Sequence, residues 1–499
     1  MGARKFAVAL IAAGIVLRLS LLLWQNGTMV DDAYISLRYA DNLIHGKGLV
    51  YNEHVRVLST TTPLYTLWLS VLLLIKSNLD PGYVIGIANL VFFGMAAWGL
   101  WALCSRRDYK AALAVLVIFT MFVRFADNTT TGMETSAFLL AMILSLVLLE
   151  RERLGWSLLV AALSMLIRPE GTLWAASLLL VAALRRMGLK PKNFLPGALV
   201  LAAWVAFGLY YYHSPIPHAM KVKSEWFAVW YHHSALAGMG NTFAALTLID
   251  LPERIVGTLL IRSLQAVLAC ATAVAFIYGA KQLFEKRDLL VVFPIFFVLY
   301  LAFYLIGRGW AEFSWYGIPS GLAYTVTSVW GVAPAIGRLK RRVSPGWVTR
   351  AAVIIVVLLA GTTLLVHQKI RLPGYAYLRN SYEKAGALVD EVAKPGDRVF
   401  ATEAGMIGYR ARRFTYDLGG IASPEVLDLY RERSFEIPLA EVWSKFMPEF
   451  IIVSPKHIRI ARAQGGLQWL EDNYETIASF PEHGVLRRRG LSAPQVPGY

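Results

Sequence analysis

The sequence predicts a polytopic α-helical membrane protein of about eleven transmembrane helices, followed by a soluble C-terminal α/β domain. Three observations support this fold class. Of the 499 residues, 57% are hydrophobic and only 16% are charged, which is too apolar for a soluble chain of this length. Apolar runs long enough to cross a bilayer recur along the chain. After Val366 the composition becomes polar, and no spanning run follows.

The predicted spans are apolar runs that alternate with charged connections. The first run follows Arg4-Lys5 and lacks a small-residue cleavage site, so we expect an uncleaved span and not a signal peptide. The apolar run at 63–75 is only about thirteen residues long, so we expect an interfacial or re-entrant helix there. The expected spans are 5–24, 82–103, 110–124, 133–150, 155–167, 171–184, 194–212, 254–280, 288–306, 313–333 and 350–367.

Basic residues predict the orientation of these spans, because lysine and arginine are retained on the cytoplasmic side. All five basic clusters fall on one side if the N-terminus is cytoplasmic, which places the C-terminal domain outside. We therefore expect a multi-pass protein of the plasma membrane with a cytoplasmic N-terminus. The clusters are Arg106-Arg107 with Lys110, residues 151–153, Arg185-Arg186 with Lys190 and Lys192, Lys281 with Lys286-Arg287, and residues 338–342 with Arg350.

The net charge of +16 is explained by these clusters and by attraction to anionic lipid, so we expect no nucleic-acid partner. The two cysteines, Cys104 and Cys270, form no spacing motif, so neither a disulfide framework nor a cysteine metal site is predicted.

Two domains are expected, a transmembrane catalytic domain at 1–367 and an outside α/β domain at 368–499. Within the second domain, residues 381–392 form an amphipathic pattern typical of a helix. Residues 397–402, 413–417, 450–454 and 474–480 have the composition of short strands.

The first predicted outside loop, residues 25–62, begins with Asp31-Asp32 about six residues beyond the first span. On a helix starting there, Asp31 and Arg38 lie on one face, with Tyr34 in the same turn. Adjacent carboxylates also complement a helix N-terminus without any catalytic role, and this alternative is stronger for Asp32.

Two further segments carry charges where the membrane disfavours them. Glu134 lies at the start of a predicted span, and Arg168 and Glu170 lie in the turn between two short spans. A role in substrate binding explains these charges. A structural ion pair that stabilises the turn also explains Arg168 and Glu170, and a solvated loop with an N-cap also explains the polar segment that ends at Glu134.

Another predicted outside segment, 211–226, contains Lys221 and Lys223, although lysine is not favoured on the outside of the membrane. Binding of a lipid-borne phosphate explains them, and so does snorkelling at the interface. His218 is suited to bond a phosphate or a backbone carbonyl. A shorter loop adds Arg308 as a cation and Tyr316 as an aromatic. Aromatics there can stack on a sugar, or they can belong to the aromatic belt of the membrane interface.

These residues resemble the GT-C superfamily of polyprenyl-phosphate-sugar glycosyltransferases, and within it the bacterial arabinofuranosyltransferases of the AftB type. The resemblance covers the whole chain in order. Its strings are the acidic pair in Asp31-Asp32-Ala33-Tyr34-Ile35, Gly46-Lys47-Gly48, Thr62-Pro63-Leu64-Tyr65, Thr131-Gly132-Met133-Glu134, Arg168-Pro169-Glu170-Gly171, Pro217-His218 with Lys223, Gly405-Met406-Ile407-Gly408-Tyr409, and Asp417-Leu418-Gly419-Gly420.

The resemblance implies that Asp31 is the catalytic base, with Asp32 as second choice, and that Lys223 binds the donor phosphate. Lys221, Arg168 and Arg308 support the phosphate site in this interpretation. Arg38, Tyr34, Glu134, His218, Glu170 and Tyr316 are the expected substrate contacts. The segment Pro217-His218-Ala219 departs from the family's Pro-Asn-Thr, so the role of that asparagine does not transfer.

The implied donor is a decaprenyl- or undecaprenyl-phosphate sugar, with arabinofuranose favoured, and the acceptor is a hydroxyl of a glycan, lipid or protein. No cofactor is assigned, and because some relatives use a divalent metal, metal assistance is left open.

A hexose-, mannose- or aminoarabinose-type transferase is the main alternative. A lipid or sugar transporter is a second, but its pseudo-symmetric halves with paired broken helices are not visible here. A non-catalytic assembly subunit is a third.

Overall fold

The computed structural model describes residues 2–75, 79–230, 259–306, 315–340 and 345–491. The chain forms two compact units, and each contains segments that are far apart in the sequence. The first unit consists of residues 1–24, 86–203 and 230–369, and the second of residues 25–85, 204–229 and 370–499. The last segment of the first unit ends at Lys369, close to the expected domain boundary at 367. The second unit, however, also includes the first predicted outside loop and the segment that carries Lys223.

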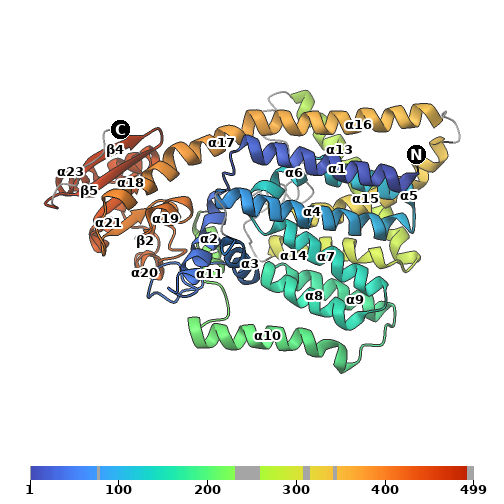
Figure 1. Ribbon diagram of the computed structural model, residues 1–499, viewed down its shortest axis with the longest axis horizontal. Coiled ribbons are helices and arrows are strands. Elements are labelled where there is room, and N and C mark those ends of the chain that lie inside the picture. The colour runs from blue at the N-terminus through green and yellow to red at the C-terminus, as the bar shows by residue number, and fades with distance from the viewer. Residues whose placement is uncertain (1, 76–78, 231–258, 307–314, 341–344, 492–499) are drawn as a thin grey trace. The chain divides into compact units, whose positions relative to one another are not determined.

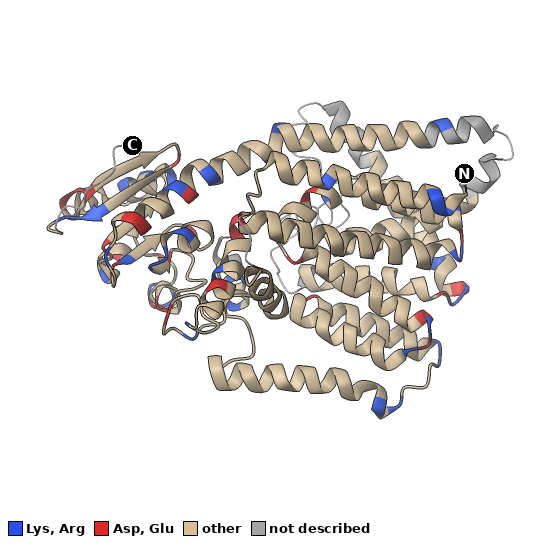
Figure 2. Ribbon diagram, in the orientation of Figure 1, with Lys and Arg blue, Asp and Glu red and all other residues tan. Residues whose placement is uncertain are grey.

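The first unit is a bundle of helices whose middles carry almost no charge, while Lys and Arg gather at the helix ends (Figures 1 and 2). This distribution is expected for helices in lipid, where an unpaired charge is costly. The helices are α1 (Ala3–Trp24), α4 (Pro81–Ser105), α5 (Tyr109–Met121), α6 (Val123–Thr130), α7 (Thr135–Glu150), α8 (Leu154–Ile167), α9 (Gly171–Leu184), α10 (Pro191–Tyr212), α13 (Leu259–Glu285), η1 (Leu289–Val291), α14 (Val292–Ile306), α15 (Gly317–Lys340), α16 (Pro345–Val366) and η2 (His367–Arg371).

Each of the eleven expected spans coincides with a helix or a helix pair, apart from residues 254–258 and 313–314, which lie outside the described residues. In the described part of the chain, five helices are long and apolar enough to cross a membrane, or six if one bent pair counts as a single span. The remaining apolar helices are shorter, so the structure supports a multi-pass protein without fixing the expected number of spans.

The expected span 110–124 is broken by an angle of 51° between α5 and α6. Phe122 has an extended backbone, so the last turn of α5 does not continue into α6. Arg18 of α1, which is completely buried, satisfies the interrupted turn. Its guanidinium donates to the carbonyls of Phe119 and Thr120, at 3.0 and 2.6 Å, and its Nε donates to Thr129 Oγ1 at 3.1 Å. A buried arginine thus replaces the hydrogen bonds that a bent helix loses in lipid.

The second unit contains a five-stranded sheet with the order β2-β1-β3-β5-β4. Strands β1 (Arg398–Ala401), β2 (Phe414–Asp417) and β3 (Phe450–Val453) are parallel. Strand β5 (His483–Arg488) pairs antiparallel with β3 on one side and with β4 (Tyr474–Phe480) on the other. The strand β3 is central and buried throughout, as its sequence Phe-Ile-Ile-Val requires. The four expected strands are present; β5 was not expected, and it pairs with β3 and β4.

The second unit also contains helices, and some of them pack against the sheet (Figure 1). The expected helix 381–392 corresponds to the end of η3 (Leu378–Glu383) and to α18 (Lys384–Val392). The run 63–75 forms the short helix α3 (Pro63–Leu73), as expected. The other helices of the unit are α2 (Asp31–Ile44), α11 (His218–Trp230), α17 (Leu372–Tyr377), α19 (Met406–Ala411), α20 (Pro424–Glu432), α21 (Leu439–Phe446), α22 (Pro455–Ala463) and α23 (Leu467–Asn473).

Candidate active site

The acidic pair stands at the first two positions of α2, where carboxylates complement the helix dipole. Asp31, however, does not only serve its own helix. Its Oδ1 accepts the N–H of Met406 at 2.7 Å, and its Oδ2 accepts the N–H of Gly405 at 3.1 Å. The carboxylate is therefore fixed against the loop that joins β1 to α19, and it is half-buried there.

Two glycines permit this close approach. A Cβ on Gly405 would lie 2.0 Å from the carbonyl oxygen of Asp31 and 2.4 Å from its carboxyl carbon. A Cβ on Gly408 would lie 1.9 Å from the hydroxyl of Tyr51. No side chain fits at either position. The string Gly405-Met406-Ile407-Gly408 is thus explained by the docking of α2 and the loop that follows it.

Arg38 lies two turns after Asp31 on the same face of α2, and it also joins this helix to the C-terminal segment. Its Nε donates to the carbonyl of Tyr51 at 2.8 Å. Its two terminal nitrogens donate to Gly408 O and Thr415 Oγ1, and to Asn52 Oδ1 and Arg413 O. All five N–H groups of the guanidinium are used. Arg38 has the position on the Asp31 face that the sequence predicted, but it has no donor left for a substrate.

The electrostatics of Asp31 suit a proton acceptor. Burial, together with the negative charge of Asp32, outweighs the two backbone N–H donors and raises the pKa of Asp31 to about 7. Glu403, which follows β1, lies in the same field. Desolvation and the charges of Asp31 and Asp32 raise the pKa of Glu403 to about 8. The carboxyl groups of Asp31 and Glu403 therefore titrate as an interacting pair near neutral pH.

Sequence reasoning missed Glu403, because nothing in its local sequence marks it. The structure places it at the carboxyl end of β1, and the parallel strand β3 ends nearby with Ser454. The strand order reverses between β1 and β3, which is the position where open sheets with parallel strands bind ligands. The same edge carries Thr402, Lys456, His457 and His483. Burial lowers the pKa of both histidines to about 4, so they are neutral at physiological pH.

The structure brings Lys223 to the acidic pair. Its Nζ lies 3.7 Å from Oδ2 of Asp32, and both side chains keep about a quarter of their surface exposed, 25% and 28%. Lys221 is two residues away on α11, about 200° around the helix, so it is directed away from Asp32. Lys221 is exposed, and its charge acts on His218 and Glu225.

The two remaining candidates in this unit have structural partners. The Nε2 of His218 donates to the carbonyl of Gly420 at 3.1 Å, and burial lowers the pKa of this histidine. Of the two roles left open for His218, the structure thus shows the bond to a carbonyl. Tyr34 is 3% exposed and packs on Tyr409, with ring centroids 5.6 Å apart.

Three further candidates meet inside the first unit. Arg168 is 2% exposed and pairs with Glu134 at 3.2 Å and with Glu170 at 3.1 Å. Tyr304 donates to Glu170 Oε1 at 2.8 Å, and the guanidinium lies over the ring of Tyr316 at 5.4 Å. One cation among two carboxylates does not attract a phosphate, so this arrangement favours the structural ion pair. Arg308 lies outside the described residues.

In the described part of the chain, no three His, Cys, Asp or Glu side chains are grouped as ligands of a metal ion. The candidate site in the second unit consists of Asp31, Asp32 and Lys223, and the charges of the two aspartates act on Glu403.

This architecture is similar to two solved structures over nearly its whole length. One is ArnT from Cupriavidus metallidurans bound to undecaprenyl phosphate, with 12% identity, coverage of 99% of this chain and 100% of that chain, and a TM-score of 0.59. The other is the archaeal oligosaccharyltransferase AglB from Archaeoglobus fulgidus in complex with an inhibitory peptide and a dolichol-phosphate, with 11% identity, coverage of 96% and 74%, and a TM-score of 0.56. Both are glycosyltransferases of the GT-C superfamily. The chain has the GT-C fold.

The sequence comparisons add less to this assignment. Residues 369–498 match a family described as a domain of unknown function (DUF8728). The sequence has no match among curated proteins. The GT-C fold is thus shown by architecture, while the AftB-type resemblance rests on the sequence motifs.

The docking of Asp31 makes a direct prediction. Gly405→Ala should lower the free energy of unfolding by about 1–3 kcal/mol or more, because the new methyl group overlaps the Asp31 backbone. Gly419→Ala is the matched control, since its Cβ would meet no atom closer than 3.5 Å. Thermal unfolding of the purified full-length protein in detergent measures both. Equal midpoints for the two variants would contradict the proposed contact.

Proposed function

We propose that this protein is a membrane glycosyltransferase that moves a sugar from a polyprenyl-phosphate donor to a hydroxyl group of an acceptor. The observation that carries the proposal is the meeting of Asp31, whose pKa is raised to about 7, with the ion pair of Asp32 and Lys223. One group can take a proton at neutral pH, and another can bind an anion. The GT-C fold supports the assignment, because both similar structures contain a lipid phosphate.

The acceptor hydroxyl is activated by Asp31 in this mechanism. The carboxylate takes the hydroxyl proton while the oxygen attacks the anomeric carbon of the donor. The bond between that carbon and the phosphate oxygen breaks, and polyprenyl phosphate leaves with the bonding electrons. Lys223 stabilises the negative charge that gathers on the departing phosphate. The N–H groups of Gly405 and Met406 hold the Asp31 carboxylate in one orientation throughout.

Asp32 and Glu403 adjust this chemistry through charge. Asp32 keeps Lys223 beside the site and raises the pKa of Asp31. Glu403 is largely protonated at neutral pH, because its pKa is raised to about 8. A protonated carboxyl group can donate a hydrogen bond as well as accept one. It therefore suits contact with a hydroxyl-rich acceptor.

The finer assignments come from the sequence motifs. The AftB-type strings favour arabinofuranose as the transferred sugar and a bacterial inner (plasma) membrane as the location, and the basic clusters favour a cytoplasmic N-terminus. The site would then face the outside, where a glycan, lipid or protein acceptor is available. Release of polyprenyl phosphate from labelled lipid-linked arabinofuranose, aminoarabinose, mannose or another hexose distinguishes these sugars. It also separates a transferase from a transporter, which leaves the lipid-linked sugar intact.

Asp31→Asn should reduce the rate of transfer by about 10²–10⁴-fold, the usual contribution of a general base. Release of polyprenyl phosphate by the purified full-length protein measures this loss. Asp417→Asn is the matched control, because Asp417 also accepts two backbone N–H groups, from Ile421 and Ala422, each at 2.7 Å. The control should lose stability but keep its turnover. An Asp31→Asn protein that inserts normally and transfers sugar at the original rate would refute the assignment.

The pH profile should identify the base independently. Transfer requires ionised Asp31, so kcat/KM, which reports groups of the free enzyme, should rise with pH through about 7 and level off above that value. Asp32→Asn removes a negative charge that raises the pKa of Asp31, so the rise should move to lower pH. Profiles of kcat/KM against pH for the wild type and the variant test this shift. A profile that stays at the same pH in the variant would contradict the assigned base.

Lys223→Ala should raise the KM for the lipid donor by roughly 10–100-fold, as expected when a charge-assisted hydrogen bond of about 1.5–3 kcal/mol is lost. Lys221→Ala removes an equal charge from the other side of the same helix and should change KM by less than about twofold. Initial rates at varied donor concentration measure both values. Equal effects of the two substitutions would show that general surface charge, and not Lys223, attracts the donor.

A further inference from the structure

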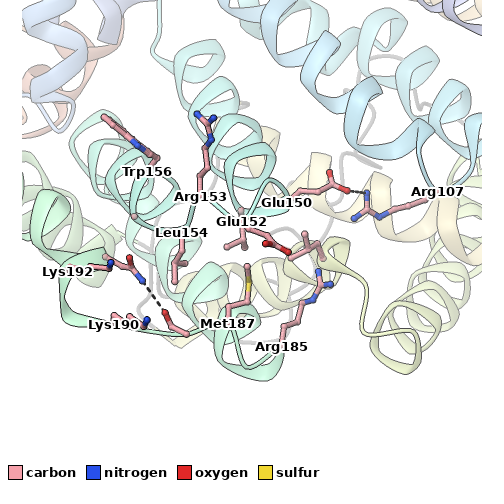
Figure 3. Close-up of a pocket in the computed structure, with 15 residues that line it drawn as sticks. Arg107, Glu150, Glu152, Arg153, Leu154, Trp156, Arg185, Met187, Lys190 and Lys192 are labelled. Atoms are coloured by element: carbon pink, nitrogen blue, oxygen red, sulfur yellow. Dashed lines mark hydrogen bonds and ion pairs between the residues drawn. The ribbon is translucent and has the colours of Figure 1, made fainter.

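A large basic cavity lies in the first unit and contains none of the residues assigned to sugar transfer. Its volume is about 1050 Å³. Its lining residues, most of them labelled in Figure 3, come from the connections α4–α5, α7–α8 and α9–α10 and the helix ends beside them, with Leu289 from η1. The charged residues that line it are Arg107, Glu150, Glu152, Arg153, Arg185, Lys190 and Lys192.

Among the residues that the structure describes, partners neutralise one of the lining cations, Arg107. Arg107 pairs with Glu150 at 2.9 Å and with Asp288 at 2.7 Å, and these bonds join three segments of the unit. Arg153, Arg185, Lys190 and Lys192 form no ion pair with any described residue. Against these four cations stands the carboxylate of Glu152. The cavity thus has an excess of positive charge and attracts an anion.

Membrane orientation alone explains the number of these cations but not their convergence. Arg106, Arg151 and Arg186 belong to the same three connections, and Lys110 lies in the first turn of α5. None of these four cations lines the cavity. The connections are also short and fixed in shape. Glu152 and Arg186 hold left-handed backbone conformations, with φ of 58° and 53°, immediately after α7 and α9. The four unpaired cations are therefore positioned around one space by the fold.

The surroundings of the cavity identify the class of anion. Trp156, which lines the cavity, is 62% exposed, and tryptophan concentrates at the headgroup level of membranes. The helix α10 begins at the cavity. Only 11% of the residues in its most apolar stretch are buried, so its surface is available to acyl chains. Leu195 and Leu199, in its first turns, are 57% and 61% exposed. A charged cavity bordered by bare apolar helix surface fits an amphiphile better than a soluble ion.

We propose that this cavity binds the phosphate-bearing headgroup of an anionic phospholipid, while the acyl chains lie along α10. Basic pockets between transmembrane helices on the positively charged side of a membrane bind such headgroups. The site is separate from the transfer chemistry and does not depend on it. It gives the basic end of the first unit a specific lipid contact in addition to its role in orientation.

Two variants with the same loss of charge test the proposal. The cavity variant carries Arg153→Gln, Arg185→Gln, Lys190→Gln and Lys192→Gln. The control variant carries Arg106→Gln, Lys110→Gln, Arg151→Gln and Arg186→Gln. The full-length proteins are reconstituted in phosphatidylcholine vesicles with increasing fractions of phosphatidylglycerol or cardiolipin, and bound lipid is measured by native mass spectrometry.

The cavity variant should bind the anionic lipid at least about tenfold more weakly than the wild type, and the control variant less than about threefold more weakly. Equal loss in both variants, or no preference of the wild type for anionic lipid, would overturn the proposal. A parallel arm adds inorganic phosphate: binding of phosphate without binding of lipid would assign the cavity to a soluble anion and also overturn it. If the fourfold variants insert poorly, Arg185→Gln with Lys192→Gln is compared with Arg151→Gln with Arg186→Gln.

Discussion

The guanidinium of Arg38 satisfies five acceptors at once, and three of them belong to residues more than 350 positions away in the chain. This one side chain joins α2, the loop after it and the edge of the C-terminal sheet. Asn52 strengthens the junction, because its side chain exchanges two hydrogen bonds with the backbone of Thr415, much as a neighbouring strand would. The position of Asp31 against Gly405 depends on this junction, since α2 carries both charged residues.

The same physical rule governs the buried charges of the first unit. In lipid, a polar group without a partner is costly, so each charge is placed where the backbone or another charge needs it. Arg18 satisfies carbonyls released by the bend between α5 and α6. Arg168 is enclosed by Glu134 and Glu170, and removal of one partner from such a cluster is far more costly than the cluster is stabilising. In a sequence, such structural charges cannot be distinguished from the charges of an active site, because both are charged residues within apolar segments.

Hydropathy predicted where the helices of the first unit lie, because the cost of burying polar groups in lipid acts on each segment separately. Four strands of the sheet were predicted for a similar local reason. The strand β5 was not, because its basic end at Arg487 and Arg488 hides its role as a partner of β3 and β4. Asp31, Asp32 and Lys223 were found as charges in predicted outside loops. Glu403 could not be, because its effect on Asp31 exists only after the sheet has folded and α2 has docked.

The division of the site between distant segments explains what the C-terminal domain contributes. Residues 369–498 match a family of their own, which would suggest an independent appendage. Yet the N–H groups that hold Asp31 belong to Gly405 and Met406, and the carboxyl group that titrates with it belongs to Glu403. A base with a pKa near 7 requires both burial and neighbouring negative charge, and the loop after β1 supplies part of each. The domain is therefore part of the candidate active site, and a chain that ends before it would leave Asp31 without the surroundings that make it a base at neutral pH.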